Sequence, residues 1–228
     1  MFIDETEKRY ELKFTVSPFY LHELHIWMHS HKLAFKSAYP NRSINNIYFD
    51  TPNYDFYNDN KDGVSDRKKV RYRWYGNCDK NINGRLELKL RKNNLGTKRY
   101  CSVPVIPNIV EINYNHLIGI CSASLKTQEH FFSHLVPTVL NKYTRSYFSS
   151  RDKEFRITVD SSIYSYSQKG HLKPNLSIDP SHFKQVVVEI KTIAKNRETL
   201  SKLISKLPFR ISRNSKYVNG FEKTKSIR

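Results

Sequence analysis

The sequence predicts an α+β fold, an eight-stranded antiparallel β-barrel with helices packed on its outside. Most periodic segments alternate between apolar and polar residues with a period of two, which is typical of β-strands. The polar positions of these segments are mainly Arg, Lys and Glu, so each strand has one apolar and one charged face. A few segments show helical periodicity, and such helices need an apolar sheet face to pack against.

The strands are predicted from this alternation alone. They cover residues 10–16, 44–50, 67–75, 85–91, 97–105, 141–148, 154–160 and 186–192. In the third of them, Arg71 and Arg73 share a face with Lys69, while Tyr72 and Trp74 occupy the other face. Eight strands with few helices favour a closed or nearly closed antiparallel barrel.

Three helices are predicted from capping residues and apolar spacing. The first has Ser17 at its N-cap and Pro18 at its first position. The second is capped by Asn196 and ends before Pro208, and a third covers residues 127–135. Segments rich in turn-forming residues predict loops over residues 58–65, 77–84, 93–96 and 167–180.

Length and composition predict a single domain that spans residues 1–228. The chain has 39 Lys and Arg against 21 Asp and Glu, a net charge of +18 that implies a polyanionic partner. Its three cysteines form no CxxC pair, and no run of 18 apolar residues occurs. We therefore expect a cytoplasmic protein without a membrane span of its own.

The charged faces decide which polyanion is expected. An ordinary sheet would expose its polar face to water. Here the helices require the apolar face, so the charged face is expected to line the interior of the barrel. Like charges about 4 Å apart repel by about 4 kcal/mol at an effective dielectric constant of about 20, so an anion must fill this interior. Arg binds phosphate through two parallel hydrogen bonds, which makes a phosphate compound the predicted ligand.

Carboxylates are interspersed among these cations, with a Glu beside a Lys on three strands. The pairs are Glu11 with Lys13, Glu87 with Lys89, and Glu189 with Lys191. Carboxylates cannot bind phosphate directly, so they either orient the cations or hold a divalent metal that bridges to phosphate oxygens. A divalent metal, Mn or Mg, is the predicted cofactor.

Eight short blocks resemble the triphosphate tunnel metalloenzyme superfamily and, within it, the VTC domain of polyphosphate polymerases. In order, they are residues 9–14 (RYELKF), 47–52 (IYFDTP), 67–75 (RKKVRYRWY), 87–90 (ELKL), 142–148 (KYTRSYF), 155–160 (FRITVD), 188–192 (VEIKT) and 215–221 (SKYVNGF). The first block has Arg9 where the related CYTH triphosphatases have a Glu, which favours the VTC branch.

The resemblance implies a role for each matching residue. The residues that would grip the reacting phosphates are Arg71, Arg73, Lys89, Arg145, Arg156 and Lys216. Further phosphate-binding residues would be Lys13, Lys69, Lys98, Tyr143, Lys191 and Ser215, with Arg99 as the alternative to Lys98. Glu189 would bind the metal, with Glu87 and Glu11 as helpers.

The implied reaction is transfer of the γ-phosphoryl group of ATP to a growing polyphosphate chain, so ATP and inorganic polyphosphate are the expected partners. A tunnel triphosphatase or polyphosphatase and a non-catalytic polyphosphate-binding module stay open as alternatives, as does a membrane-protein partner. A nucleic-acid-binding protein is disfavoured, because Tyr72 and Trp74 alternate away from Arg71 and Arg73 instead of sharing their face.

Overall fold

One antiparallel sheet organises the protein. The computed structural model describes residues 3–5, 9–92, 95–125, 129–207 and 209–225. Its strands are β1 (Ile3–Glu5), β2 (Arg9–Val16), β3 (Lys36–Asp50), β4 (Asp66–Tyr75), β5 (Arg85–Lys92), β6 (Leu95–Ser102), β7 (Val136–Ser149), β8 (Phe155–Ser167), β9 (Ser181–Phe183) and β10 (Val186–Ile193). The eight predicted strands are all present; β1 and β9 have three residues each, too few for periodicity to reveal.

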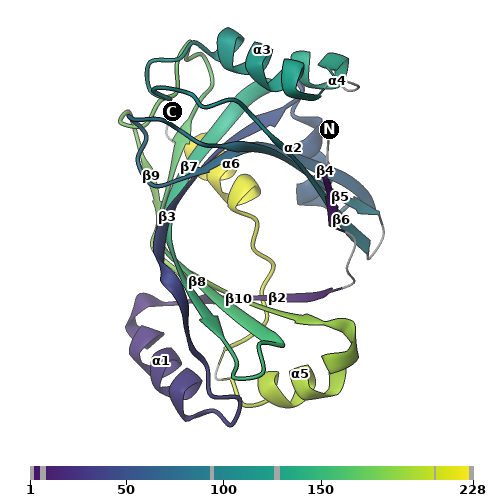
Figure 1. Ribbon diagram of the computed structural model, residues 1–228, viewed down its shortest axis with the longest axis vertical. Coiled ribbons are helices and arrows are strands. Elements are labelled where there is room, and N and C mark those ends of the chain that lie inside the picture. The colour runs from purple at the N-terminus through teal and green to yellow at the C-terminus, as the bar shows by residue number, and fades with distance from the viewer. Residues whose placement is uncertain (1–2, 6–8, 93–94, 126–128, 208, 226–228) are drawn as a thin grey trace.

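The closed barrel is not confirmed. The strand order is β1-β6-β5-β4-β3-β7-β8-β10-β2, with β9 paired to β8. Among the described residues, β1 pairs with β6 and β2 with β10, and no hydrogen bonds join β1 to β2. These end strands are nevertheless consecutive in the chain, so Glu5 and Arg9 can be at most about 14 Å apart. The sheet therefore bends round until its two edges face each other (Figure 1).

The helices include the three predicted ones and three that were missed. They are α1 (Leu21–Ser30), preceded by the 3₁₀ turn η1 (Pro18–Tyr20), α2 (Asp55–Asp62), α3 (Tyr114–Leu125), α4 (Glu129–Ser133), α5 (Arg197–Ile204), preceded by η2 (Ala194–Asn196), and α6 (Lys216–Lys225). Helices α1, α4 and α5 match the predictions. Residues 127–128 of the predicted third helix, residues 93–94 of a predicted loop and Pro208 lie outside the described part. Helix α2 replaces much of the loop expected over residues 58–65. No helix in the described part of the chain is long and apolar enough to cross a membrane.

The apolar faces of the strands pack outward against helices in two main clusters. One cluster contains Trp74 and Leu86 from the sheet together with Leu117 of α3 and Phe132 of α4. In the other, strand residues such as Ile157 pack with the apolar sides of α1 and α5. Figure 1 shows α3 and α4 at one end of the molecule and α1 and α5 at the other, all outside the curved sheet.

Helix α6 is an exception to the predicted outside position. Its Tyr217 stacks on Tyr48 of β3, with ring centroids 5.0 Å apart, and packs with Val139 of β7. Tyr48 shares the charged face, because its hydroxyl accepts a hydrogen bond from Arg71. Helix α6 thus lies on the inner face of the sheet, where these apolar side chains give it a place to pack. Figure 1 shows the segment that leads to α6 crossing the space that the strands surround.

Candidate phosphate-binding interior

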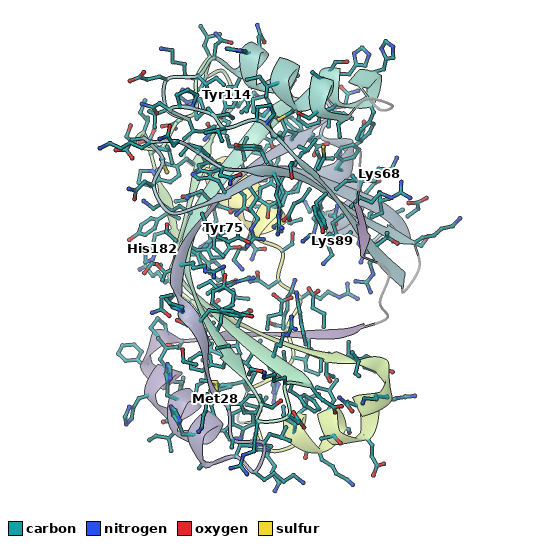
Figure 2. All side chains as sticks on the ribbon, viewed as in Figure 1. Met28, Lys68, Tyr75, Lys89, Tyr114 and His182 are labelled. Carbon is teal, nitrogen blue, oxygen red and sulfur yellow. The ribbon has the colours of Figure 1, made fainter. Side chains whose placement is uncertain are left out.

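The charged faces of the strands turn towards the enclosed space, as the alternation predicted. Figure 2 shows Lys89 of β5 facing this space, whereas Lys68 of β4 lies on the outer side of the same sheet. The Nζ atom of Lys68 lies 5.8 Å from the ring centroid of Phe131 on the outer helix α4.

Contacts across the interior bring distant strands together. Lys89 Nζ on β5 lies 3.5 Å from Glu11 Oε2 on β2, although these two strands are not neighbours in the sheet. Lys69 Nζ on β4 donates a 2.9 Å hydrogen bond to Ser215 Oγ, just before α6. The charged residues of both halves of the sheet therefore face one common interior.

Glu87 is the centre of the largest cation cluster. Its carboxylate pairs with four side chains at N···O distances of 2.6 to 3.9 Å, namely Arg71, Arg85, Lys98 and Arg73. Burial raises the pKa of Glu87, but the charges of Arg71 and Arg73 outweigh it and hold the pKa far below its usual value. Both carboxylate oxygens are occupied by cations, so Glu87 orients guanidinium groups in this structure.

A second cluster surrounds Asp160 on β8, which sequence reasoning did not select as a site residue. Arg145 forms a bidentate pair with it at 2.5 and 2.8 Å, and Lys216 Nζ lies 2.5 Å from Oδ2. Asp160 is fully buried, and the two cations lower its pKa against the opposing effect of burial. The alternation along β8 places Asp160 on the charged face, but its partners Arg145 and Lys216 come from β7 and α6.

A third cluster joins two carboxylates. Glu189 pairs with Lys191 at 2.9 Å, and Glu11 pairs with Lys13 at 3.0 Å. Burial raises the pKa of Glu189, yet Lys191, Lys13 and Arg145 hold it well below its usual value. Lys191 Nζ also lies 3.7 Å from Glu11 Oε2, so one lysine bridges the two carboxylates.

These two carboxylates fit a divalent metal in part. Among the described residues no group of three or more His, Cys, Asp or Glu side chains could hold a metal ion. Mg²⁺ commonly uses one or two carboxylates and completes its shell with water and substrate phosphates. Glu189 and Glu11 supply two such carboxylates, and a metal there would displace lysine and arginine nitrogens that lie 2.9 to 3.8 Å from their oxygens. Glu87 is paired with four cations.

Tyr143 lies beneath the cations of the second cluster. The Nζ atom of Lys216 is 4.6 Å and the guanidinium carbon of Arg145 is 5.5 Å from its ring centroid. Burial raises the pKa of Tyr143, but Arg145 and Arg73 outweigh it and lower the pKa overall. Its hydroxyl therefore lies in a strongly positive environment.

The structure brings together all but one of the predicted site residues. The converging residues are Lys13, Lys69, Arg71, Arg73, Lys89, Lys98, Tyr143, Arg145, Lys191, Ser215, Lys216, Glu11, Glu87 and Glu189. Lys98, and not Arg99, belongs to the charged face, since Lys98 contacts Glu87. Arg156 is the exception. It is opposite Lys191 but exposed, and no described carboxylate pairs with it, because it lies near the start of β8, at the edge of the interior.

The sequence matches the VTC domain over residues 8–225, nearly the whole chain. The chain belongs to the VTC-domain family. A comparison with curated proteins gives no match for this VTC domain.

Solved structures share the fold of this VTC domain at low sequence identity. A candidate adenylyl cyclase from Hippeastrum, described as having a dominant triphosphatase activity, gives a TM-score of 0.54 at 16% identity and covers 93% of this chain and 94% of its own. A candidate adenylate cyclase from Bacillus halodurans gives 0.53 at 13% identity, with 93% and 95% covered. A protein from Pyrococcus horikoshii OT3 gives 0.52 at 14% identity, with 94% and 99% covered. These similarities establish the fold alone.

Proposed function

We propose that this VTC domain is a polyphosphate polymerase, which transfers the γ-phosphoryl group of ATP to a polyphosphate chain held in the cationic interior. The observation that carries the proposal is the convergence of lysines and arginines from β2, β4, β5, β7, β10 and α6 on one interior. The family match supports a polyphosphate ligand, and the triphosphatase activity described for the Hippeastrum relative supports phosphoanhydride chemistry on this fold.

The fixed cations suit phosphoryl transfer, which needs in-line positioning and charge neutralisation more than covalent chemistry. Glu87 holds Arg71 and Arg73, and Asp160 holds Arg145 and Lys216, before any ligand arrives. Donors fixed in advance need little reorganisation when charge develops on the transferred group. The terminal phosphate of the acceptor chain is already anionic, so no side chain is required as a base.

Glu189 and Glu11 would hold the divalent cation in this proposal. When bound, such an ion supplies additional positive charge to the phosphate oxygens. The protein's own contribution is to keep both carboxylates ionised, and the lysines beside them do this by lowering the pKa values of Glu11 and Glu189.

A tunnel triphosphatase is the second candidate function, favoured by the activity described for the Hippeastrum relative. The two reactions differ in the acceptor, which is water in the hydrolase and a polyphosphate end in the polymerase. Purified protein should be incubated with ATP, Mn²⁺ and a short polyphosphate primer. Lengthening of the primer, with one ADP released for each phosphate added, supports the polymerase. Release of orthophosphate without chain growth overturns the polymerase in favour of the hydrolase.

The same assay on variants separates the two kinds of interior residue. Glu189→Gln removes a carboxylate but no cation, so polyphosphate should bind as well or better while turnover falls by orders of magnitude. Lys89→Met removes one phosphate contact and leaves Glu11 paired with Lys13, so binding should weaken by about 1.5 to 3 kcal/mol.

Lys92→Met is the matched control, because Lys92 is exposed on the same strand and has the opposite parity to Lys89. It should change affinity little. Equal losses for Lys89→Met and Lys92→Met would mean that only net charge matters. Parallel loss of binding and turnover in Glu189→Gln would assign Glu189 to orienting Lys191 instead of holding a metal.

A further inference from the structure

A cluster of tyrosines surrounds Arg42 of β3, beside the end of β4 and outside the residues considered so far. The guanidinium carbon of Arg42 lies 5.4, 5.8 and 5.7 Å from the ring centroids of Tyr39, Tyr75 and Tyr147. Tyr39 and Tyr147 also meet edge to face, with centroids 5.7 Å apart. Three rings thus gather around one positive charge, and neither the phosphate-binding residues nor the metal carboxylates include any of them.

A β-bulge in β3 makes this cluster. Tyr39 pairs with Tyr147 and Arg42 pairs with Arg145, so β3 advances three residues where β7 advances two. The extra residue reverses the alternation, and Tyr39 and Arg42 consequently face the same side as Arg145. Pro40, which lies within the bulge, lacks the N–H group that regular pairing would use. Bulges that re-aim side chains are frequent beside binding sites.

The cluster is continuous with the cationic interior. The guanidinium carbon of Arg73, which contacts Glu87, lies 5.4 Å from the ring centroid of Tyr75. The pKa of Tyr147 is raised by burial, and the charges of Arg145, Arg73 and Arg42 act against this rise. In Figure 2, Tyr75 lies beside β3, across the enclosed space from Lys89. A ligand whose phosphates reach Arg73 and Arg145 would therefore place its next group against these tyrosines.

Two of the three rings are open to solvent, and Tyr147 is half-buried. Tyr39 is 57% and Tyr75 is 41% exposed, whereas Arg73 is 7% exposed. Exposed aromatic rings beside arginine are the side chains on which nucleobases stack, and such stacking tolerates any base. The face of a tyrosine ring offers nothing to a phosphate chain, which could use only the hydroxyl group.

We propose that Tyr39, Tyr75 and Tyr147, together with Arg42, form a nucleobase-binding site at the mouth of the cationic interior, which makes the protein prefer a nucleoside triphosphate over inorganic triphosphate. The proposal rests on the proposed function, because it assumes that the phosphates occupy the interior. It assigns the base of the nucleotide to the tyrosine cluster and the triphosphate to the cations.

The test compares dissociation constants for ATP and for inorganic tripolyphosphate, which carry the same number of phosphates. Tyr75→Leu should raise the dissociation constant for ATP on the order of tenfold and leave that for tripolyphosphate within about twofold. Tyr75→Phe keeps the ring and should retain ATP affinity. Tyr20→Leu changes a tyrosine of similar exposure on η1, which contacts Phe209 outside the sheet, and should change neither constant.

The outcomes separate this inference from the proposed function. If Tyr75→Leu raises both dissociation constants by the same factor, or raises neither, the base site is refuted. Binding of tripolyphosphate by the wild-type protein would still support the phosphate-binding interior. If wild-type protein binds neither ligand, both proposals fail.

Discussion

The interior lysine Lys69 has a pKa far below the usual value of a lysine. Its ammonium group donates to Ser215, and no described carboxylate forms an ion pair with it. Burial lowers its pKa first, and the cations Lys13 from β2, Lys89 from β5, and Arg67 and Arg71 from its own strand lower it further, to about 7. Without a bound anion, Lys69 is therefore half neutral near pH 7 and mostly neutral at pH 8.

A bound polyphosphate should return the missing proton to Lys69, because anionic oxygens favour the ammonium form. At pH 8, binding should take up protons, whereas at pH 6 the lysine is already charged and contributes no uptake. Calorimetry in two buffers of different ionisation enthalpy measures this uptake. Lys69→Arg, which stays charged, should remove the lysine's share while the ligand's own protons contribute equally to both proteins. Identical uptake in the two proteins at pH 8 would contradict the assigned pKa.

Two glycines show how an element depends on its neighbours. A Cβ atom added at Gly84, just before β5, would meet the ring of Tyr72 at 2.2 Å, and that ring is fully buried among the outer core residues. A Cβ atom at Gly119, within α3, would meet nothing within 4 Å. The same substitution therefore has opposite expected effects at the two positions.

Gly84→Ala should lower the free energy of unfolding by about 1 to 3 kcal/mol through overpacking. Gly119→Ala should raise it by up to about 1 kcal/mol, since alanine favours the helix interior. Urea titrations of both variants measure these changes. A neutral Gly84→Ala would mean that β5 can move away from Tyr72 at little cost.

The elements also show which parts of the fold sequence periodicity can reach. Alternation is local, so it located eight strands and assigned the inward parity of Arg71, Lys89 and Glu189. Helix α2 was not predicted, because its start depends on Asp50, which accepts hydrogen bonds from the backbone N–H groups of Phe56 and Tyr57. That contact is formed only once β3 is in place.

The site was predictable to the same extent. Face alternation and family resemblance selected the phosphate-binding cations, but they gave Asp160 no role, because its partners Arg145 and Lys216 come from β7 and α6. They also placed Arg156 with the other cations. Arg156 is on the charged face, but it is exposed because it lies near the start of β8. The tyrosine cluster depends on a bulge, which reverses the parity on which the sequence argument rested.

At the scale of the whole molecule, the net charge of +18 and the common interior predict a specific stabilisation by phosphate chains. Tripolyphosphate at about one hundred times its dissociation constant should stabilise the fold by about 2.7 kcal/mol. For a chain of this size that corresponds to a rise in Tm of about 5 to 11 °C. Thermal unfolding should be compared with sodium chloride of equal ionic strength and with a DNA duplex of equal phosphate concentration, both of which should shift Tm much less. An equal rise with DNA would contradict an enclosed binding site, because a duplex is too wide to enter it.

The pairing of β2 with β10 has a consequence for how the chain acquires its structure during synthesis. Val16 pairs with Val186 and Arg9 with Ile193, so β2 must wait until a segment far downstream in the chain has been synthesised. The hairpins from β3 to β6 can form meanwhile, but distant pairings form slowly because a long loop must close first. Throughout that delay the apolar side of β2, with Leu12 and Phe14, has no partner. Glu11 and Lys13 on the same strand then protect the nascent protein, because charges on an unpaired edge discourage aggregation with neighbouring chains.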